Sequence, residues 1–324
     1  MENALISVVI PTYNRESLIT EALDSVFNQS YRPLEVIVVD DGSTDRTVEV
    51  VGNWIDAISA SDMFVVRLFS QENMGGNWAR NRGIDASSGK FIAFLDSDDL
   101  WLRDKLQKQI KRFDDPEVGG VYCGVQHVDV SSAQVTASYN RKYPVGWILD
   151  QILVRDVTAS TSAFILRKEV FERVGGFDVD LQARQDWDMW IRLASENKVE
   201  AVPEVLVQYR EHSGPRTASD PMREIRAYEV IRKKYAALLK RQTPRVQKAA
   251  KASFYKRMGR VYFHHKISTA KALQFYTVAI FNQPDDIDTW AAIIGVFLPT
   301  SFRQWLHHLW NRIFGETTLA IRSH

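Results

Sequence analysis

The 324-residue sequence contains a single cysteine, Cys123, which excludes a disulfide framework and a zinc site built from several cysteines. It also lacks compositional bias, since 45% of the residues are hydrophobic and 25% are charged. These values exclude a disordered, collagen-like or low-complexity chain. At about 150 residues per domain, the length predicts two structural units in a globular protein of a reducing compartment.

Long apolar runs are missing as well. The first run, residues 5–10, stops at Pro11 and follows Glu2 where a secretory signal would have basic residues. The strongest later run, residues 290–298, is far shorter than the roughly 20 residues that a spanning helix needs. We therefore expect a cytoplasmic protein with no signal peptide and no transmembrane helix.

The formal net charge is only +1, but it is unevenly distributed. Residues 221–324 contain 18 Lys and Arg against 6 Asp and Glu, which leaves 23 against 34 in residues 1–220. An acidic front half suits a site for metal cations. A basic tail suits an anionic partner such as membrane lipid or nucleic acid.

Short apolar runs alternate with helical patterns over the first hundred residues. Strands are expected at 5–10, 34–39, 64–69 and 91–95, with helical spacing of apolar residues between them. This alternation predicts an α/β fold with a mostly parallel sheet and helices on both faces. From Met222 onward the pattern changes to long helices, so we place a boundary near residues 215–221.

Acidic residues follow two of these strands, at the edge of the sheet where ligands bind in such folds. Asp96-Ser97-Asp98 follows an apolar strand, and its two carboxylates suit Mg²⁺ or Mn²⁺. The alternative is an Asp-rich turn in which Asp99 caps the next helix.

Asp40-Asp41 ends the second strand, where a carboxylate can accept hydrogen bonds from a base or a ribose. Burying two adjacent acids is costly unless a cation or ligand offsets it. The alternative for these acids is an Asx-turn at the start of a helix. Ser43 or Thr44 is the expected N-cap of the helix that follows.

Six short blocks occur together in one order. They are VVIPTYNR at 8–15, VVDDGS at 38–43, NMG at 73–75 with ARNRG at 79–83, FLDSDD at 94–99, GGFD at 175–178 and QDWD at 185–188. With these blocks the sequence from about residue 6 to residue 219 resembles the inverting nucleotide-sugar transferases of glycosyltransferase family 2, which have the GT-A fold. The resemblance implies a GT-A catalytic domain at 1–220, with a nucleotide-sugar half at about 1–100 and an acceptor half at about 101–220. A basic helical region follows at 221–324.

The resemblance also implies a donor site. Pro11, Tyr13 and Arg15 lie at its nucleotide edge, where the Tyr13 ring can stack on the base, and Asp41 recognises uracil. Gly75 permits close approach of the backbone.

A cation near the nucleotide is implied at Arg80, for which a surface helix position is the alternative. Asp96-Ser97-Asp98 corresponds to the metal motif of the family, in which Asp98 reaches the cation on the diphosphate. His212 contacts the diphosphate or completes the metal shell, or it is a loop histidine without a role.

Asp186 corresponds to the general base that takes the proton of the attacking sugar hydroxyl. The metal stabilises the departing nucleotide, and a single displacement inverts the anomeric centre. Gln185 departs from the Glu that is common in the family, which removes a negative charge beside the base. Asp188 is a second candidate base, and its alternative is a helix-surface acid that favours the helix macrodipole.

The basic tail suggests a membrane surface. Residues 223–271 contain 15 Lys and Arg and only two acids, and no nucleic-acid-binding motif is visible. Residues suited to an interfacial segment follow, namely Trp290, Phe297, Trp305, Leu306, Leu309, Trp310 and Phe314. We therefore expect residues 223–314 to contact an anionic membrane, the alternative being helices that pack only on the catalytic domain.

Together these features predict a metal-dependent inverting glycosyltransferase that transfers a hexosyl or N-acetylhexosaminyl group from a UDP-sugar. The expected acceptor is a glycan or lipid-linked hydroxyl in polysaccharide or lipopolysaccharide synthesis. One alternative is a catalytically silent GT-A-like module, which Gln185 favours and the intact acids disfavour. A nucleotidyltransferase would need a basic, glycine-rich phosphate loop that residues 11–15 do not supply.

Overall fold

The computed structural model describes residues 4–58, 61, 63–138, 143–157, 160–212 and 220–298. The chain forms two compact units. We call the first the α/β unit (Met1–Leu149, Val157–Leu181 and Gln185–Gly214) and the second the helical unit (Asp150–Asp156, Gln182–Arg184 and Pro215–His324).

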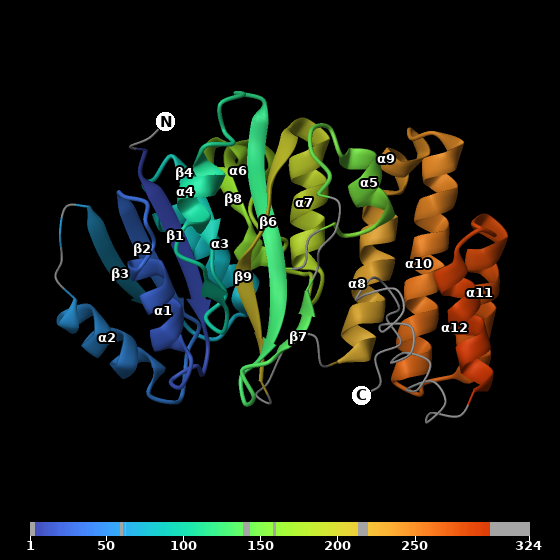
Figure 1. The fold of residues 1–324 in the computed structure, drawn as a ribbon, viewed down its shortest axis with the longest axis horizontal. Helices are drawn as coiled ribbons and strands as arrows, with labels where there is room; N and C mark the ends of the chain where they lie inside the picture. The colour runs from blue at the N-terminus through green and yellow to red at the C-terminus, as the bar shows by residue number, and fades with distance from the viewer. Residues whose placement is uncertain are drawn as a thin grey trace. The chain divides into compact units, whose positions relative to one another are not determined.

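A single mixed sheet forms the centre of the α/β unit (Figure 1). Its strands within the described residues are β1 (Ile6–Thr12), β2 (Leu34–Asp40), β3 (Phe64–Ser70), β4 (Phe91–Phe94), β5 (Leu100–Trp101), β6 (Val118–Asp129), β7 (Val135–Ser138), β8 (Ile165–Arg167) and β9 (Lys198–Glu211). They are ordered β3-β2-β1-β4-β8-β6-β9-β5, and β7 pairs with β6. Strands β1 to β4 are parallel, β8 is antiparallel to both β4 and β6, and β6 is parallel to β9. The carboxyl ends of β1, β2, β4, β6 and β9 therefore share one edge.

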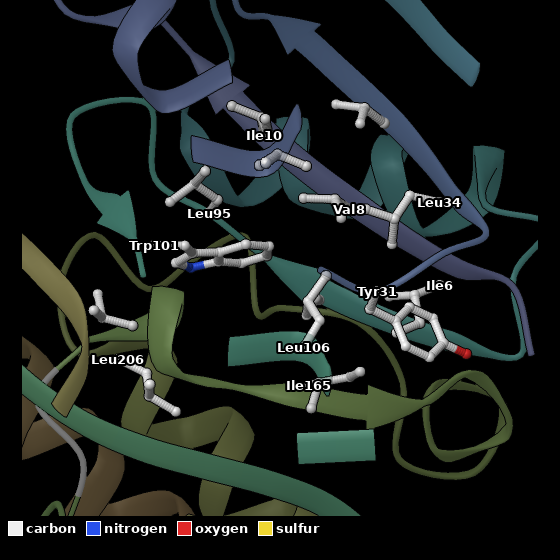
Figure 2. Packing of buried hydrophobic residues seen from close by; sticks show 14 of the residues in the cluster. Ile6, Val8, Ile10, Tyr31, Leu34, Leu95, Trp101, Leu106, Ile165 and Leu206 are labelled. Atoms are coloured by element: carbon white, nitrogen blue, oxygen red, sulfur yellow. The ribbon is translucent and has the colours of Figure 1, made fainter. Parts of the chain in front are cut away.

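Helices cover both faces of this sheet. They are α1 (Ile19–Phe27), α2 (Thr47–Ala57), α3 (Gly76–Ala86), α4 (Lys105–Ile110), α6 (Lys168–Val174) and α7 (Gln185–Glu196). On one face, Ile6, Val8 and Ile10 of β1 belong to a buried apolar cluster with residues of α1, α2 and α4. Figure 2 shows these three side chains and Leu106 of α4. Because β1 and β2 are covered on both faces, all their residues are buried, which explains why their sequences are almost continuously apolar.

On the other face, α3 lies directly on β1. A β-carbon at Gly83 would overlap the side chain of Val9, so only glycine allows this approach. The close packing places the first turn of α3 at the carboxyl edge of the sheet.

The start of α2 differs from the prediction. The helix begins at Thr47, and neither Ser43 nor Thr44 is its N-cap. The backbone N–H of Ser43 donates to the Asp40 carboxylate (3.1 Å), and that of Thr44 donates to Asn14 Oδ1 (2.8 Å). These bonds hold the segment in a turn and delay the helix.

The helical unit contains α8 (Pro221–Lys234), α9 (Ala236–Lys240), α10 (Pro244–His264), α11 (Thr269–Asn282), α12 (Ile287–Phe297) and most of α5 (Leu149–Val154). Asp220, Thr243 and Ser268 cap α8, α10 and α11 with side-chain hydrogen bonds. Helices α10 and α11 pack closely, because Gly259 leaves room for the Tyr276 ring. None of the described helices is long and apolar enough to cross a membrane.

Candidate active site

Asp98 is the centre of a cluster of charged side chains at the carboxyl edge of the sheet. Its Oδ2 lies 3.0 Å from His212 Nε2, after β9, and 3.2 Å from Arg15 Nη2, after β1. Burial raises the pKa of Asp98, but the His212 hydrogen bond and the Arg15 charge outweigh it and leave that pKa below its usual value. The sheet topology thus brings together three predicted site residues from distant parts of the sequence.

Arg80 is buried and not a surface residue of α3. Its Nη2 lies 2.5 Å from Asp96 Oδ1, and its guanidinium lies over the Phe177 ring at 5.6 Å from the centroid. The ion pair fixes the Asp96 carboxylate at the end of β4. It also places the guanidinium within the predicted metal motif, where it compensates one of the two carboxylate charges.

Asp99 does not cap a helix, because the short strand β5 follows it. Its carboxylate accepts hydrogen bonds from the hydroxyls of Ser162 (2.6 Å) and Ser160 (3.1 Å). The Ser162 hydroxyl also accepts the backbone N–H of Asp96 (3.0 Å). Burial and the charges of Asp98 and Asp96 raise the pKa of Asp99 well above its usual value. This network fixes the turn, and no sequence motif marked the two serines.

Arg210 is a further site residue that the sequence did not reveal. Its side chain is buried and donates to the backbone carbonyls of Asp98 (Nε, 2.6 Å) and Leu18 (Nη2, 2.9 Å). It also forms an ion pair with Glu21 at 2.9 Å. The guanidinium therefore connects the loop after β4 to α1.

Asp41 organises the loop that precedes α3. One carboxylate oxygen accepts the Gln71 side-chain N–H (2.8 Å) and the Met74 N–H (3.0 Å), and the other accepts the Gly75 N–H (2.7 Å). Gly75 has φ 102°, which favours glycine. Beside this loop, β1 and β2 pair through Pro11 and Val39.

Two other residues of the predicted nucleotide-sugar site differ in their exposure to solvent. The Tyr13 side chain is 42% exposed, so its ring is available to a ligand. Ser97 is buried within the turn after β4.

Asp186 and Asp188 lie in the first turn of α7 but in different surroundings. Asp186 is half-buried and accepts the Trp187 N–H at 2.8 Å. Asp188 is fully buried and forms an ion pair with Arg192 at 2.9 Å. Asp188 is therefore not a helix-surface acid, and its carboxylate is less suited than that of Asp186 to accept a proton from a substrate.

The metal ligands predicted from the sequence are only partly assembled. Among the described residues, no group of three or more His, Cys, Asp or Glu side chains has a metal-binding arrangement. Asp98 and His212 offer a carboxylate and an imidazole that are hydrogen-bonded to each other, Asp98 is also paired with Arg15, and Asp96 is paired with Arg80. This donor pair fits a divalent cation whose other ligands come from water and phosphate oxygens.

The fold is shared with solved structures that contain nucleotide sugars. S. aureus TarS in complex with UDP-GlcNAc aligns with a TM-score of 0.62 at 20% identity, over 93% of this chain and 92% of that chain. A mannosyltransferase from Pyrobaculum calidifontis in complex with GDP-Man and Mn²⁺ aligns with a TM-score of 0.60 at 22% identity, over 93% and 83%. These likenesses show a GT-A fold and confirm the predicted fold class.

The family profile described as glycosyl transferase family 2 matches residues 7–175, which is more than half of the chain. The protein belongs to this family. An uncharacterized glycosyltransferase of Rickettsia typhi is 29% identical over 246 residues, 74% of this chain and 73% of that protein. Another, of Rickettsia felis, is 28% identical over 225 residues, 68% of this chain. The chain spans about a third (35%) of the length of this second relative.

Proposed function

We propose that the protein is an inverting glycosyltransferase that moves a hexosyl or N-acetylhexosaminyl group from a UDP-sugar to a hydroxyl group. The cluster of Arg15, Asp98 and His212 at the carboxyl edge of the sheet carries this proposal. Two fold neighbours whose complexes contain UDP-GlcNAc or GDP-Man with Mn²⁺ support it.

The donor would lie across the loops after β1 and β2. The exposed Tyr13 ring offers a stacking surface for the base. The Asp41 carboxylate accepts three hydrogen bonds from the protein, and a carboxylate has about four acceptor positions, so one remains for an N–H of uracil. Arg15 and Arg80 provide positive charge near the expected diphosphate.

Mg²⁺ or Mn²⁺ would be held by Asp98 and His212. Bound there, such a cation would stabilise negative charge on the departing nucleotide, which makes a general acid unnecessary. Asp98 is suited to this task because it follows β4 at the carboxyl edge of the sheet and supplies the carboxylate oxygen that such a cation prefers. Asp96 stays with Arg80 and shapes the turn.

Asp186 would act as the general base. As the acceptor oxygen attacks the anomeric carbon, its proton moves to the Asp186 carboxylate and the bond to the diphosphate breaks on the opposite side. The position in the first turn of α7 favours a carboxylate, because the helix N-terminus carries partial positive charge. The anomeric configuration is inverted by this single displacement.

The decisive experiment compares donor binding and transfer for a panel of UDP- and GDP-sugars with and without Mn²⁺. We expect Asp98→Ala to lose metal-dependent binding. Asp186→Asn should retain binding but lower the transfer rate by about 10²–10⁴-fold. Asp56→Asn, at an exposed position of α2, is the matched control. A folded protein that binds no nucleotide sugar would overturn the proposal.

Gln185 favours one other function, a silent module that binds nucleotide sugars without transfer. Its side-chain Oε1 is buried and has no hydrogen-bond partner among the described residues. The same experiment separates the two functions. Donor binding without turnover by the native protein, across a panel of glycan and lipid-linked acceptors, would favour the silent module.

We also propose that the helical region contacts an anionic membrane at the cytoplasmic face, where a lipid-linked glycan or lipopolysaccharide precursor would be the acceptor. Four apolar side chains on one side of α12 are exposed, namely Ile287 (72%), Trp290 (47%), Ile294 (57%) and Phe297 (72%). Exposed cations such as Lys248 and Lys251 lie on α10 of the same unit. Trp305, Leu306, Leu309, Trp310 and Phe314 lie outside the described residues.

Sedimentation with lipid vesicles tests this contact. The native chain should sediment with vesicles rich in phosphatidylglycerol and less with phosphatidylcholine vesicles. Ile294→Glu combined with Phe297→Glu should reduce sedimentation, whereas Thr277→Glu on the exposed side of α11 should not. Equal sedimentation of all three proteins would contradict a role for α12.

A further inference from the structure

Asn81 of α3 forms a reciprocal pair of hydrogen bonds with the segment that follows α6. Its Nδ2 donates to the backbone carbonyl of Phe177 (2.8 Å), and its Oδ1 accepts the Phe177 N–H (2.7 Å). The carboxamide supplies the donor and the acceptor on two neighbouring atoms of one planar group. A β-carbon at Gly176 would overlap Asn81 Oδ1, so the glycine makes room for this pair.

Asn77, one turn earlier on the same face of α3, contacts the far end of the same segment. Its Nδ2 donates to the carbonyls of Asp178 (2.8 Å) and Leu181 (2.9 Å). Asn77 is 8% exposed, so these carbonyls are satisfied in a place that water hardly reaches. The two asparagines together bind the backbone of residues 177–181 at four points.

The Phe177 side chain adds a third attachment. Its ring packs edge-on against Phe94 of β4, with ring centroids 5.2 Å apart, and Arg80 lies over it. Because Arg80 is also paired with Asp96, the same turns of α3 contact both the end of β4 and residues 177–181. We call Asn77 and Asn81 the asparagine clamp.

We propose that the asparagine clamp positions the general base relative to the donor. The inference rests on the proposed function, in which Asp98 and Asp186 act on the same substrate pair. Asp186 follows the clamped segment by five residues, whereas Asp98 follows β4 by four. Through α3, the clamp joins the chain leading to α7 to the sheet that carries the donor loops.

The clamp residues are positioning residues, because they bind backbone and not substrate. A displacement of the base by about 1 Å can lower a transfer rate by about 100-fold while the donor contacts stay in place. Loss of the clamp should therefore lower kcat and leave donor affinity unchanged. If the clamp only stabilised the fold, its loss would lower the melting temperature and would not separate kcat from donor affinity.

The test uses Asn81→Asp and Asn77→Asp in the full chain, because both substitutions keep the side-chain shape. Each carboxylate would face a backbone carbonyl oxygen where an N–H now donates. We expect kcat for transfer to fall by about 10–100-fold, while the Kd of the donor, from calorimetry, changes by less than about threefold. Asn53→Asp, at an exposed position of α2, is the matched control and should behave like the native chain.

Hydrogen exchange supplies a readout that does not depend on activity. The Phe177 amide should exchange faster in Asn81→Ala, which removes its acceptor, than in the native chain, and the control should not differ. Faster exchange with unchanged kcat would overturn the positioning role, as would a loss of donor affinity equal to the loss of kcat. If the native chain transfers no sugar but the exchange result holds, the proposed function fails and the clamp remains only a structural link.

Discussion

Some cations of the α/β unit and of the helical unit differ sharply in their surroundings. In the α/β unit, Arg80 and Arg210 are buried and are held by carboxylates and backbone carbonyls. In the helical unit, cations such as Lys240, Lys248 and Lys251 are exposed. Buried charges fix the geometry of a site, because moving them breaks several hydrogen bonds at once. Exposed charges instead create an electrostatic field that attracts an anionic surface from a distance.

Loss of Arg210 should produce the largest change in stability. Arg210→Met leaves the carbonyls of Asp98 and Leu18 without their donor, and we expect the free energy of unfolding to fall by about 3–5 kcal/mol. Urea unfolding measures it. Arg241→Met, at an exposed position of the helical unit, is the control. Similar losses of unfolding free energy in both variants would contradict the difference between buried and exposed cations.

Lys105 is a buried cation whose effect on stability should depend on pH. Its Nζ donates to Gln109 Oε1 (2.8 Å) and lies 4.0 Å from the Trp101 ring centroid. Burial lowers the pKa of Lys105 from 10.5 to about 8. The unfolded chain therefore binds more protons between these values, so the contribution of Lys105 to stability rises as pH increases from about 8.

Lys105→Met removes this titration. Relative to the variant, the native chain should gain stability from pH 7 to pH 9.5, with a full difference on the order of 3 kcal/mol above the unfolded pKa. Unfolding curves of both proteins measure the difference, in which titrating groups that do not interact with Lys105 cancel. A difference that is constant over this range would show that the buried side chain does not titrate there.

Loss of the Ser162 hydroxyl should have a smaller effect on stability and should also weaken metal binding. Ser162→Ala leaves the Asp96 N–H and the Asp99 carboxylate with one partner fewer, at a cost of about 1–3 kcal/mol. Metal affinity should also fall, because Asp96 and Asp98 belong to the same turn. Ser131→Ala, at the exposed turn between β6 and β7, is the comparison. Unchanged metal affinity in a destabilised Ser162→Ala would separate the two effects.

The exposed cations should give the smallest change in stability. Replacing Lys248 and Lys251 by Gln is expected to change the free energy of unfolding by less than about 0.5 kcal/mol. The same substitutions should weaken sedimentation with anionic vesicles by up to about 1 kcal/mol per residue. A large loss of stability would show that these lysines support the fold as the buried charges do, and would contradict the contrast between buried and exposed cations.

The sequence was sufficient for much of this architecture. The alternation of apolar runs and helical patterns predicts β1 to β4. Because the carboxyl ends of parallel strands share one edge of a sheet, it also predicts that residues after these strands lie close together. The structure indeed brings Arg15, Asp98 and His212 together. Their roles toward a donor or a metal stay predictions.

The supporting contacts could not be predicted. Ser162 is 63 residues from Asp99, and Arg210 is 112 residues from Asp98, with no motif to join them. The predicted start of α2 was wrong because Asn14, 30 residues earlier, accepts the Thr44 N–H and holds this segment in a turn before the helix. Long-range hydrogen bonds of this kind depend on the assembled sheet, and local sequence contains little information about them.

Residues 182–184 belong to the helical unit although they directly precede α7. Arg184 forms an ion pair with Glu224 and lies over the Tyr228 ring at 5.2 Å from its centroid. The two units are therefore not interchangeable modules. A recombined protein that took its last hundred residues from a relative would keep Asp186 but lose the partners of Arg184, two residues before it. A functional recombined protein would need Arg184, Glu224 and Tyr228 to come from the same parent.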